Sequence, residues 1–262
     1  MTDLAESGTA GFYGKVPVKG DFVSHRLPRS FLDAWDPWLQ AAIAQSRAHL
    51  HDAWLDTYLT SPVWSFALSA GVCGPVPVAG VMMPSVDRVG RYFPFVLAAL
   101  LPDCDIPAAL PQSGRQWFQR LEELALTSLE DRFELAGFDQ RLQALGLPGY
   151  PRRQDPGMPG GTETVDPRHG GLTVALGPSA DALAAYPDLV HHIFAAARSE
   201  YSLWWTTGSD RVPPCLVTAL GLPPEDAFTA FFDGRWRYWG WGGRYPHALP
   251  GVTAVGTSGH GG

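Results

Sequence analysis

One short stretch, residues 82–95, holds the side chains best suited to chemistry, and it lies between two apolar runs. Its charged or reactive members are Ser85, Asp87, Arg88, Arg91 and Tyr92. Aspartate and arginine are almost never fully buried unless they are paired. Three interpretations of these charges therefore stay open: a solvated rim, a binding site, or a structural turn. In the structural turn Asp87 pairs with Arg88 or Arg91 or caps the turn, and Gly90 supplies a positive φ.

A second group of charges lies near the N-terminus. The Gly20-Asp21 pair is a turn signal, and Lys15, Lys19 and Asp21 lie in or beside that turn. These charges are either solvated turn residues or part of a loop that lies beside the Asp87–Arg91 turn. In the second case we expect Lys15 and Asp21 to form salt bridges with that turn.

The same residues would support hydrolysis only if Asp21, Ser85 and Asp87 converged in a pocket. The local sequence does not favour this, because Ser85 lacks the flanking glycines of a nucleophile elbow. The chain contains no Walker phosphate loop, no dinucleotide fingerprint and no H-E-x-x-H pattern. Its cysteines are too far apart for a metal-ligand pattern. We expect no catalytic site, no metal, no cofactor and no small-molecule substrate.

Strands are expected to position these charges. Ala79–Met83 and Phe93–Leu101 are short apolar runs with flanking breakers, as is typical of buried strands. The pattern does not decide whether they form a hairpin or a wider connection. Phe12–Val16 predicts another strand, which Pro17 ends or confines to an edge. Val63–Leu68 alternates large and small side chains, with the period of a strand.

Helices are expected to cover these strands. Ser30–Leu59 carries an apolar stripe in which Trp35 and Trp38 are candidate core residues. Pro37 fits if it lies in the first turn, as the residue after an Asp36 N-cap, or if it kinks the helix. Ser113 and Gln116 form a capping-box pattern that predicts a further helix start. The remaining predicted elements are helices at Phe138–Leu145, Asp181–Ser199 and Pro224–Phe232, and strands at Leu172–Leu176, Ser202–Thr206 and Leu216–Leu220.

Composition outlines the domain organisation. Residues 147–171 hold five prolines and six glycines and almost no large apolar side chain, which predicts a flexible loop. We expect residues 11–245 to form one domain around this loop. Residues 1–10 and 246–262 are expected to be disordered tails.

Bulk properties exclude several classes of function. The formal net charge is −7 and no dense lysine or arginine cluster occurs, which argues against nucleic-acid binding and an anionic membrane surface. No apolar run is long enough for a spanning helix, so we expect no membrane insertion. Three widely spaced cysteines suit a reducing, cytoplasmic location.

Several segments together resemble the TagF family, also called ImpM, of type VI secretion-associated proteins. The resemblance covers residues from about 11 to about 235, and its most specific part is the Pro-Ser-x-Asp-x-x-Gly-Arg-x-Phe-Pro run over Pro84–Pro94. Pro37 departs from the family's more usual residue at its position. The segments that carry the resemblance are Gly11–Val23, Trp35–Leu39, Val63–Phe66, Gly80–Pro94 and Leu203–Ser209.

The resemblance implies an α/β fold, a three-layer α/β/α sandwich with a mixed, largely antiparallel central sheet. It also implies a cytoplasmic regulator that represses the type VI secretion system after translation, by binding the forkhead-associated (Fha) scaffold protein. A small hydrolase and a structural accessory of the apparatus remain the alternatives. On the binding hypothesis, the candidate contact residues are Lys15, Asp21, Ser85, Asp87, Arg88, Arg91 and Tyr92.

Overall fold

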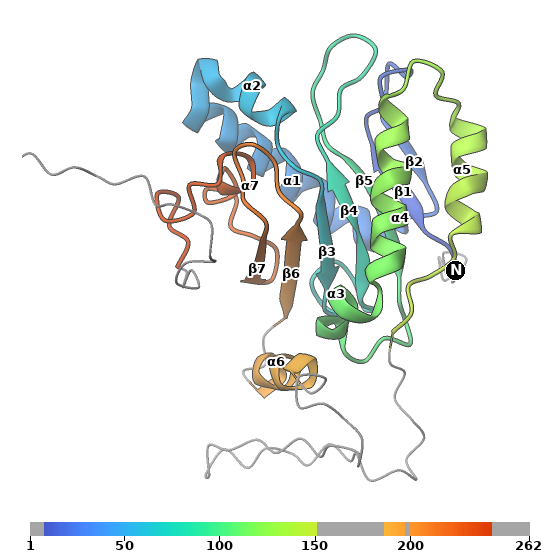
Figure 1. Cartoon of the computed structure of the whole chain (residues 1–262), viewed down its shortest axis with the longest axis vertical. Coiled ribbons are helices and arrows are strands. Elements are labelled where there is room, and N and C mark those ends of the chain that lie inside the picture. Colours follow the sequence, from blue (N-terminus) through green and yellow to red (C-terminus); the bar gives the residue numbers. More distant parts are fainter. Residues whose placement is uncertain (1–7, 151–185, 197–199, 243–262) are drawn as a thin grey trace, which may run out of the picture.

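A computed structural model describes residues 8–150, 186–196 and 200–242 of the chain. Within these residues the strands form one sheet in the order β2-β1-β5-β4-β3-β6-β7 (Figure 1). The strands are β1 (Gly11–Gly14), β2 (Val23–His25), β3 (Trp64–Leu68), β4 (Val78–Met83), β5 (Phe95–Leu100), β6 (Tyr201–Thr206) and β7 (Cys215–Leu220).

All pairs between the described strands are antiparallel. The prediction of an α/β fold with a largely antiparallel sheet is confirmed. The predicted mixed character is wrong for the described strands, because none of them pairs in parallel. Ala79–Met83 and Phe93–Leu101 pair with each other as β4 and β5, so the connection that the sequence left open is a hairpin.

Helices pack on both faces of the sheet (Figure 1). Helices α1, α2 and α7 contribute to a hydrophobic core on one face, and α4 and α5 to a second core on the opposite face. The helix bounds are α1 (Arg29–Leu50), α2 (Trp54–Leu59), α3 (Leu110–Ser113), α4 (Arg115–Leu126), α5 (Leu135–Ala144), α6 (Tyr186–Ala196) and α7 (Ala230–Asp233).

The central strands are buried on both faces, which explains their continuous apolar sequences. In β3, Trp64, Phe66 and Leu68 join the core beside α1, whereas Ala67 joins the core beside α4. Every residue of β4 is buried. Strands of this kind form rigid supports for the loops at their ends.

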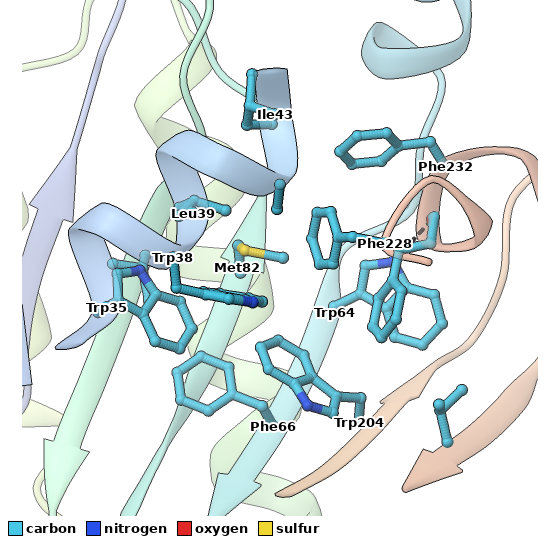
Figure 2. Close-up of a cluster of buried hydrophobic side chains, with 14 of the residues drawn as sticks. Trp35, Trp38, Leu39, Ile43, Trp64, Phe66, Met82, Trp204, Phe228 and Phe232 are labelled. Carbon is cyan, nitrogen blue, oxygen red and sulfur yellow. Dashed lines mark hydrogen bonds between the residues drawn. The ribbon is translucent and has the colours of Figure 1, made fainter. Parts of the chain in front are cut away.

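Tryptophans dominate the core beside α1. Trp35 and Trp38 of α1 face Phe66 of β3 and Trp204 of β6 (Figure 2). The Trp35 and Phe66 rings have centroids 4.9 Å apart, and those of Trp38 and Trp204 are 5.8 Å apart. The prediction that Trp35 and Trp38 are core residues is confirmed. Much of the tryptophan content therefore stabilises the fold.

A helix is confirmed where the sequence predicted one from Ser30 onward, but of the options for Pro37 a place in the first turn after an Asp36 N-cap is wrong. Helix α1 begins at Arg29, so Pro37 lies inside it, and the carboxylate of Asp36 accepts a hydrogen bond from Tyr13 (2.7 Å) instead of capping. A proline in a helix interior costs about 3 kcal/mol. The early start buries Phe31 completely, and burying a side chain of this size contributes roughly 1.5–3 kcal/mol. Burial of the first two turns therefore offsets most of that cost.

Two other predicted helix starts also differ. Ser113 ends α3, where its hydroxyl donates to the carbonyl of Ala109 (3.0 Å), and Gly114 precedes α4 in its place. Pro224 does not start a helix: turns lead to α7 at Ala230–Asp233. Gly234 follows α7 with a positive φ of 70°, as is typical of a glycine just past a helix C-terminus.

Some predicted features fall partly or wholly outside the described residues. The predicted strand Leu172–Leu176, most of the predicted loop at 147–171 and the predicted tail at 246–262 lie there. Ala10, which the sequence assigned to a tail, is buried, and its carbonyl accepts a hydrogen bond from Arg26. None of the helices in the described residues has the length and apolar character needed to cross a bilayer.

Candidate functional site

The two charged segments found in the sequence lie side by side. We call residues 15–22, which follow β1, and residues 84–94, which connect β4 to β5, the double loop. The two segments meet because β1 pairs with β5, with Gly14 opposite Phe95. A Cβ atom on Gly14 would lie 2.2 Å from the carbonyl oxygen of Pro94, so only glycine permits this approach.

Asp87 is the centre of the double loop. Its side chain is buried, and the ammonium of Lys15 donates to Oδ2 at 2.6 Å. Arg91 donates to the same oxygen through Nε at 2.7 Å. The backbone amides of Val89 and Arg91 donate to Oδ1 at 3.0 and 2.9 Å. An ionised carboxylate has about four acceptor sites, so these donors saturate Asp87.

These contacts set the ionisation of Asp87. Burial alone would raise the pKa of its carboxyl group, because the charged form loses solvation. The hydrogen bonds from Lys15, Arg91 and the Val89 amide outweigh that effect and hold the pKa well below its usual range. Asp87 is therefore ionised at neutral pH and has no free acceptor site for a substrate proton.

The turn after Asp87 has the geometry that its sequence suggested. The amide of Gly90 donates to the carbonyl of Asp87 at 3.0 Å, and Gly90 has a φ of +84°. Within the turn Asp87 thus acts as a cap, and Gly90 supplies the left-handed residue.

Further contacts join the two segments. The amide of Arg88 donates to the carbonyl of Lys19 at 2.9 Å. The guanidinium of Arg91 donates to the carbonyl of Gly20 and lies 3.6 Å from the carboxylate of Asp21. Of the two alternatives for the N-terminal charges, the observed one is a loop beside the Asp87–Arg91 turn, joined to it by Lys15 and Asp21.

Aromatic residues support the base of the hairpin. The hydroxyl of Tyr58 in α2 donates to the carbonyl of Ser85 at 2.9 Å and accepts from its amide at 2.8 Å. Tyr92 packs against Tyr58 and Trp54 with ring centroids 6.0 and 5.9 Å away. These two predicted site residues, Ser85 and Tyr92, attach the hairpin to α2.

The outer surface of the double loop combines charge with apolar area. Val89 at the hairpin tip is 65% exposed, and Phe22 is 43% exposed. Phe22 is held in place by stacking on Tyr13 and by Lys15, whose ammonium lies 4.5 Å from the ring centroid. The exposed charged residues of the double loop are Lys19, Asp21, Arg88 and Arg91.

Of the predicted site residues, Lys15, Asp87, Arg91 and Asp21 form one connected cluster. Arg88 joins it through its backbone and leaves its side chain exposed. Sequence reasoning missed Phe22, Val89 and Tyr58 as parts of the site. The Gly20-Asp21 turn signal placed Phe22 in a loop, and that position was the available signal for it.

The geometry does not assemble the components of a hydrolase at Ser85. Its side chain is buried, and its hydroxyl has no hydrogen-bond partner within the described residues. A serine nucleophile needs a general base within hydrogen-bond reach, and the nearby Asp87 is saturated by its donors. No group of metal-ligating side chains occurs among the described residues.

Comparisons with known proteins agree with this architecture. Residues 11–145 match the model of the TagF N-terminal domain, described as type VI secretion system-associated. The crystal structure of PA0076 from Pseudomonas aeruginosa PAO1 superposes with a TM-score of 0.71 at 36% sequence identity. That match covers 94% of this chain and 100% of PA0076. A comparison with curated proteins found no match. The family match includes both segments of the double loop, and we conclude that this chain belongs to the TagF family of type VI secretion-associated proteins.

Proposed function

We propose that this protein represses the type VI secretion system after translation, in the cytoplasm, by binding the forkhead-associated protein through the double loop. The observation that carries the proposal is the contrast between a saturated ionic interior and an exposed outer surface. Inside, Asp87 accepts three hydrogen bonds from its own turn and one from Lys15 of the other segment. Outside, Val89, Phe22 and Arg88 are presented to solvent on that rigid support.

This surface has the composition of a protein contact. Binding hot spots are enriched in arginine and in aromatic side chains, and a preorganised surface loses less entropy on binding. The charge distribution also favours a partner of opposite sign: the double loop holds four basic and two acidic residues, a formal charge of +2, whereas the whole chain has −7. A repressor that sequesters its partner needs such a surface and no reaction centre.

Exposure and contacts show which residues can be replaced to test the proposal without disturbing the fold. Arg91 is unsuitable, because replacing it would remove a hydrogen bond to Asp87 and disturb the fold. Arg88 and Val89 are exposed, and their side chains take no part in the buried cluster. Arg120 on α4 is an exposed arginine far from the double loop in sequence, and it provides a matched control.

Purified wild-type protein should retain the forkhead-associated protein of the same secretion system in a pull-down assay. We expect Arg88→Glu and Val89→Asp to weaken this binding by at least about tenfold, which corresponds to about 1.4 kcal/mol. Arg120→Glu should bind like wild type, and all three variants should melt like wild type. Undiminished binding by both loop variants would exclude the double loop as the contact surface.

A cellular assay tests the regulatory role itself. A deletion strain should secrete more type VI substrate, wild-type protein should restore repression, and Arg88→Glu should not. If the chain instead co-sediments with the assembled machine and its deletion abolishes secretion, it is a structural accessory and the proposal is wrong.

A further inference from the structure

A groove adjoins the double loop on the α5 side of the sheet. It has a volume of about 820 Å³ and lies between residues 18–25 and the start of α5. Its floor is apolar: Phe12, Val23 and Phe133 line it and belong to the core beside α4 and α5. Pockets of this size with apolar floors are typical of ligand and anchor sites.

The groove and the double loop are continuous. Val18, Lys19 and Phe22 belong to the double loop and also line the groove. Phe22 is partly exposed, and its ring is fixed by an edge-to-face contact with Phe93 at 4.9 Å. A partner that contacts Arg88 and Val89 therefore has an apolar recess beside its contact surface.

Charge is distributed unevenly around the groove. Lys19 lies on the double-loop side and is exposed. Glu134 lies on the α5 side and is also exposed, whereas Asp139 is neutralised by an ion pair with Arg26. An occupant with carboxylates on the double-loop side would complement Lys19 and the +2 charge of that loop, and would keep its carboxylates away from Glu134.

We propose that the groove receives an apolar anchor side chain from an acidic segment of a protein partner, with the acidic residues lying over the double loop. This inference rests on the proposed function, since it specifies how the double loop recognises its partner. The anchor would bury its apolar surface on Phe12, Val23 and Phe133, and nearby acidic residues would pair with Lys19 and Arg88. Anchor residues in pockets, surrounded by polar contacts, dominate the affinity of many interfaces.

Two positions on α5 allow a matched test. Ala136 lines the groove and is exposed, so a larger side chain there would fill the groove without disturbing the core. Gln140 is exposed one turn later on the same helix and does not line the groove. Ala136→Trp and Gln140→Trp therefore add the same side chain to one helix, inside and outside the groove.

The probe is a phage-displayed library of random peptides, selected on the wild-type full chain. We expect enrichment of peptides in which a large apolar residue is flanked by aspartate or glutamate. Their affinity should fall at least about tenfold for Ala136→Trp, as for loss of an anchor contact, and stay unchanged for Gln140→Trp. Lys19→Gln should reduce the dependence of their affinity on salt, because it removes a charge contact.

Several outcomes would overturn the inference: no enrichment, enrichment of basic or uncharged peptides, or equal binding to Ala136→Trp and wild type. Self-association through the groove, detected as a dimer that Ala136→Trp disrupts, would also overturn it.

Binding of the forkhead-associated protein to the loop and groove variants separates this inference from the proposed function. If Arg88→Glu weakens binding of the forkhead-associated protein but Ala136→Trp does not, the groove inference fails and the proposed function stands. If selected peptides bind in the groove but that protein does not bind the wild type, the proposed function fails.

Discussion

Two ionic clusters connect distant parts of this chain, and they differ in burial. In the double loop, Lys15 reaches Asp87 across 72 positions of sequence, and the carboxylate is fully buried. Beside the groove, Arg26 reaches Asp139 across 113 positions, and that carboxylate is 19% exposed. The first cluster joins two loops into one support, whereas the second joins the two walls of a groove.

The difference in burial predicts a difference in energy. A buried carboxylate loses its hydration, so removing one of its partners leaves a charge that the remaining donors compensate only in part and that water cannot reach. A partly exposed carboxylate can regain water when it loses a partner, and such pairs contribute less. The cluster around Asp87 should therefore contribute strongly to the free energy of unfolding, as core contacts do. The pair of Arg26 and Asp139 should contribute less.

Lys15→Met should have the largest effect on stability. The substitution keeps an unbranched side chain that is one atom shorter, and it removes a cation from the buried Asp87. We expect the melting temperature to fall by roughly 5–10 °C, because breaking a buried ion pair is strongly destabilising even when a second cation remains. Thermal unfolding followed by circular dichroism measures this change.

Lys19→Met is the control for that experiment. Lys19 lies on the same loop but is exposed. Its replacement should shift the melting temperature by only about 1 °C. Equal shifts for the two lysine variants would show that burial does not distinguish the clusters.

Asp139→Asn should have a smaller effect than Lys15→Met. The amide keeps the shape of the side chain but loses the charge-assisted contact with Arg26. We expect a loss of about 1 kcal/mol in the free energy of unfolding. Urea unfolding measures this loss, and a loss as large as that of Lys15→Met would remove the contrast between the clusters.

The pH dependence of stability should reflect the lowered pKa values of both carboxylates, Asp87 and Asp139. Hydrogen bonding by Arg26 is the main cause that lowers the pKa of Asp139, and the donors to Asp87 lower its pKa despite burial. Because both values are depressed in the folded state, their stabilisation is complete above the unfolded value of about 3.9 and is lost as pH falls below it. We expect the melting temperature to decrease between about pH 5 and pH 2. Asp139→Asn should show a shallower decrease, and an identical slope would contradict this assignment.

Asp21→Ala should have the smallest effect on stability. The Asp21 side chain is almost fully exposed and meets Arg91 at 3.6 Å. Exposed pairs of this kind contribute roughly 0–1 kcal/mol, so unfolding should change little. A large destabilisation would mean that Asp21 helps to hold the double loop together.

Much of the candidate site could be predicted from local sequence. Apolar runs on both sides of Asp87 indicated strands, and Gly90 indicated a turn with a positive φ; both features depend on neighbouring residues. Helix starts were less predictable. Pro37 and Ser113 carried strong local signals, but burial of Phe31 extended α1 past Pro37, and Ser113 bonded back to the preceding turn.

The groove was beyond prediction from the sequence. Its walls come from residues around Phe22 and around Ala136, which no local pattern connects. Its ionic contact joins Arg26 to Asp139 only because α5 packs beside the edge of the sheet.

The amino-acid sequence by itself determined where strands, turns and charges occur, and its motifs indicated the TagF family. Only the tertiary structure decided which charges are structural. Asp87 and Arg88 are adjacent in sequence and equally polar, yet one is buried beneath four donors and the other is exposed. The reason is that β1 pairs with β5, which are distant in sequence. This pairing brings Lys15 to one side of the hairpin, where it covers the carboxylate of Asp87.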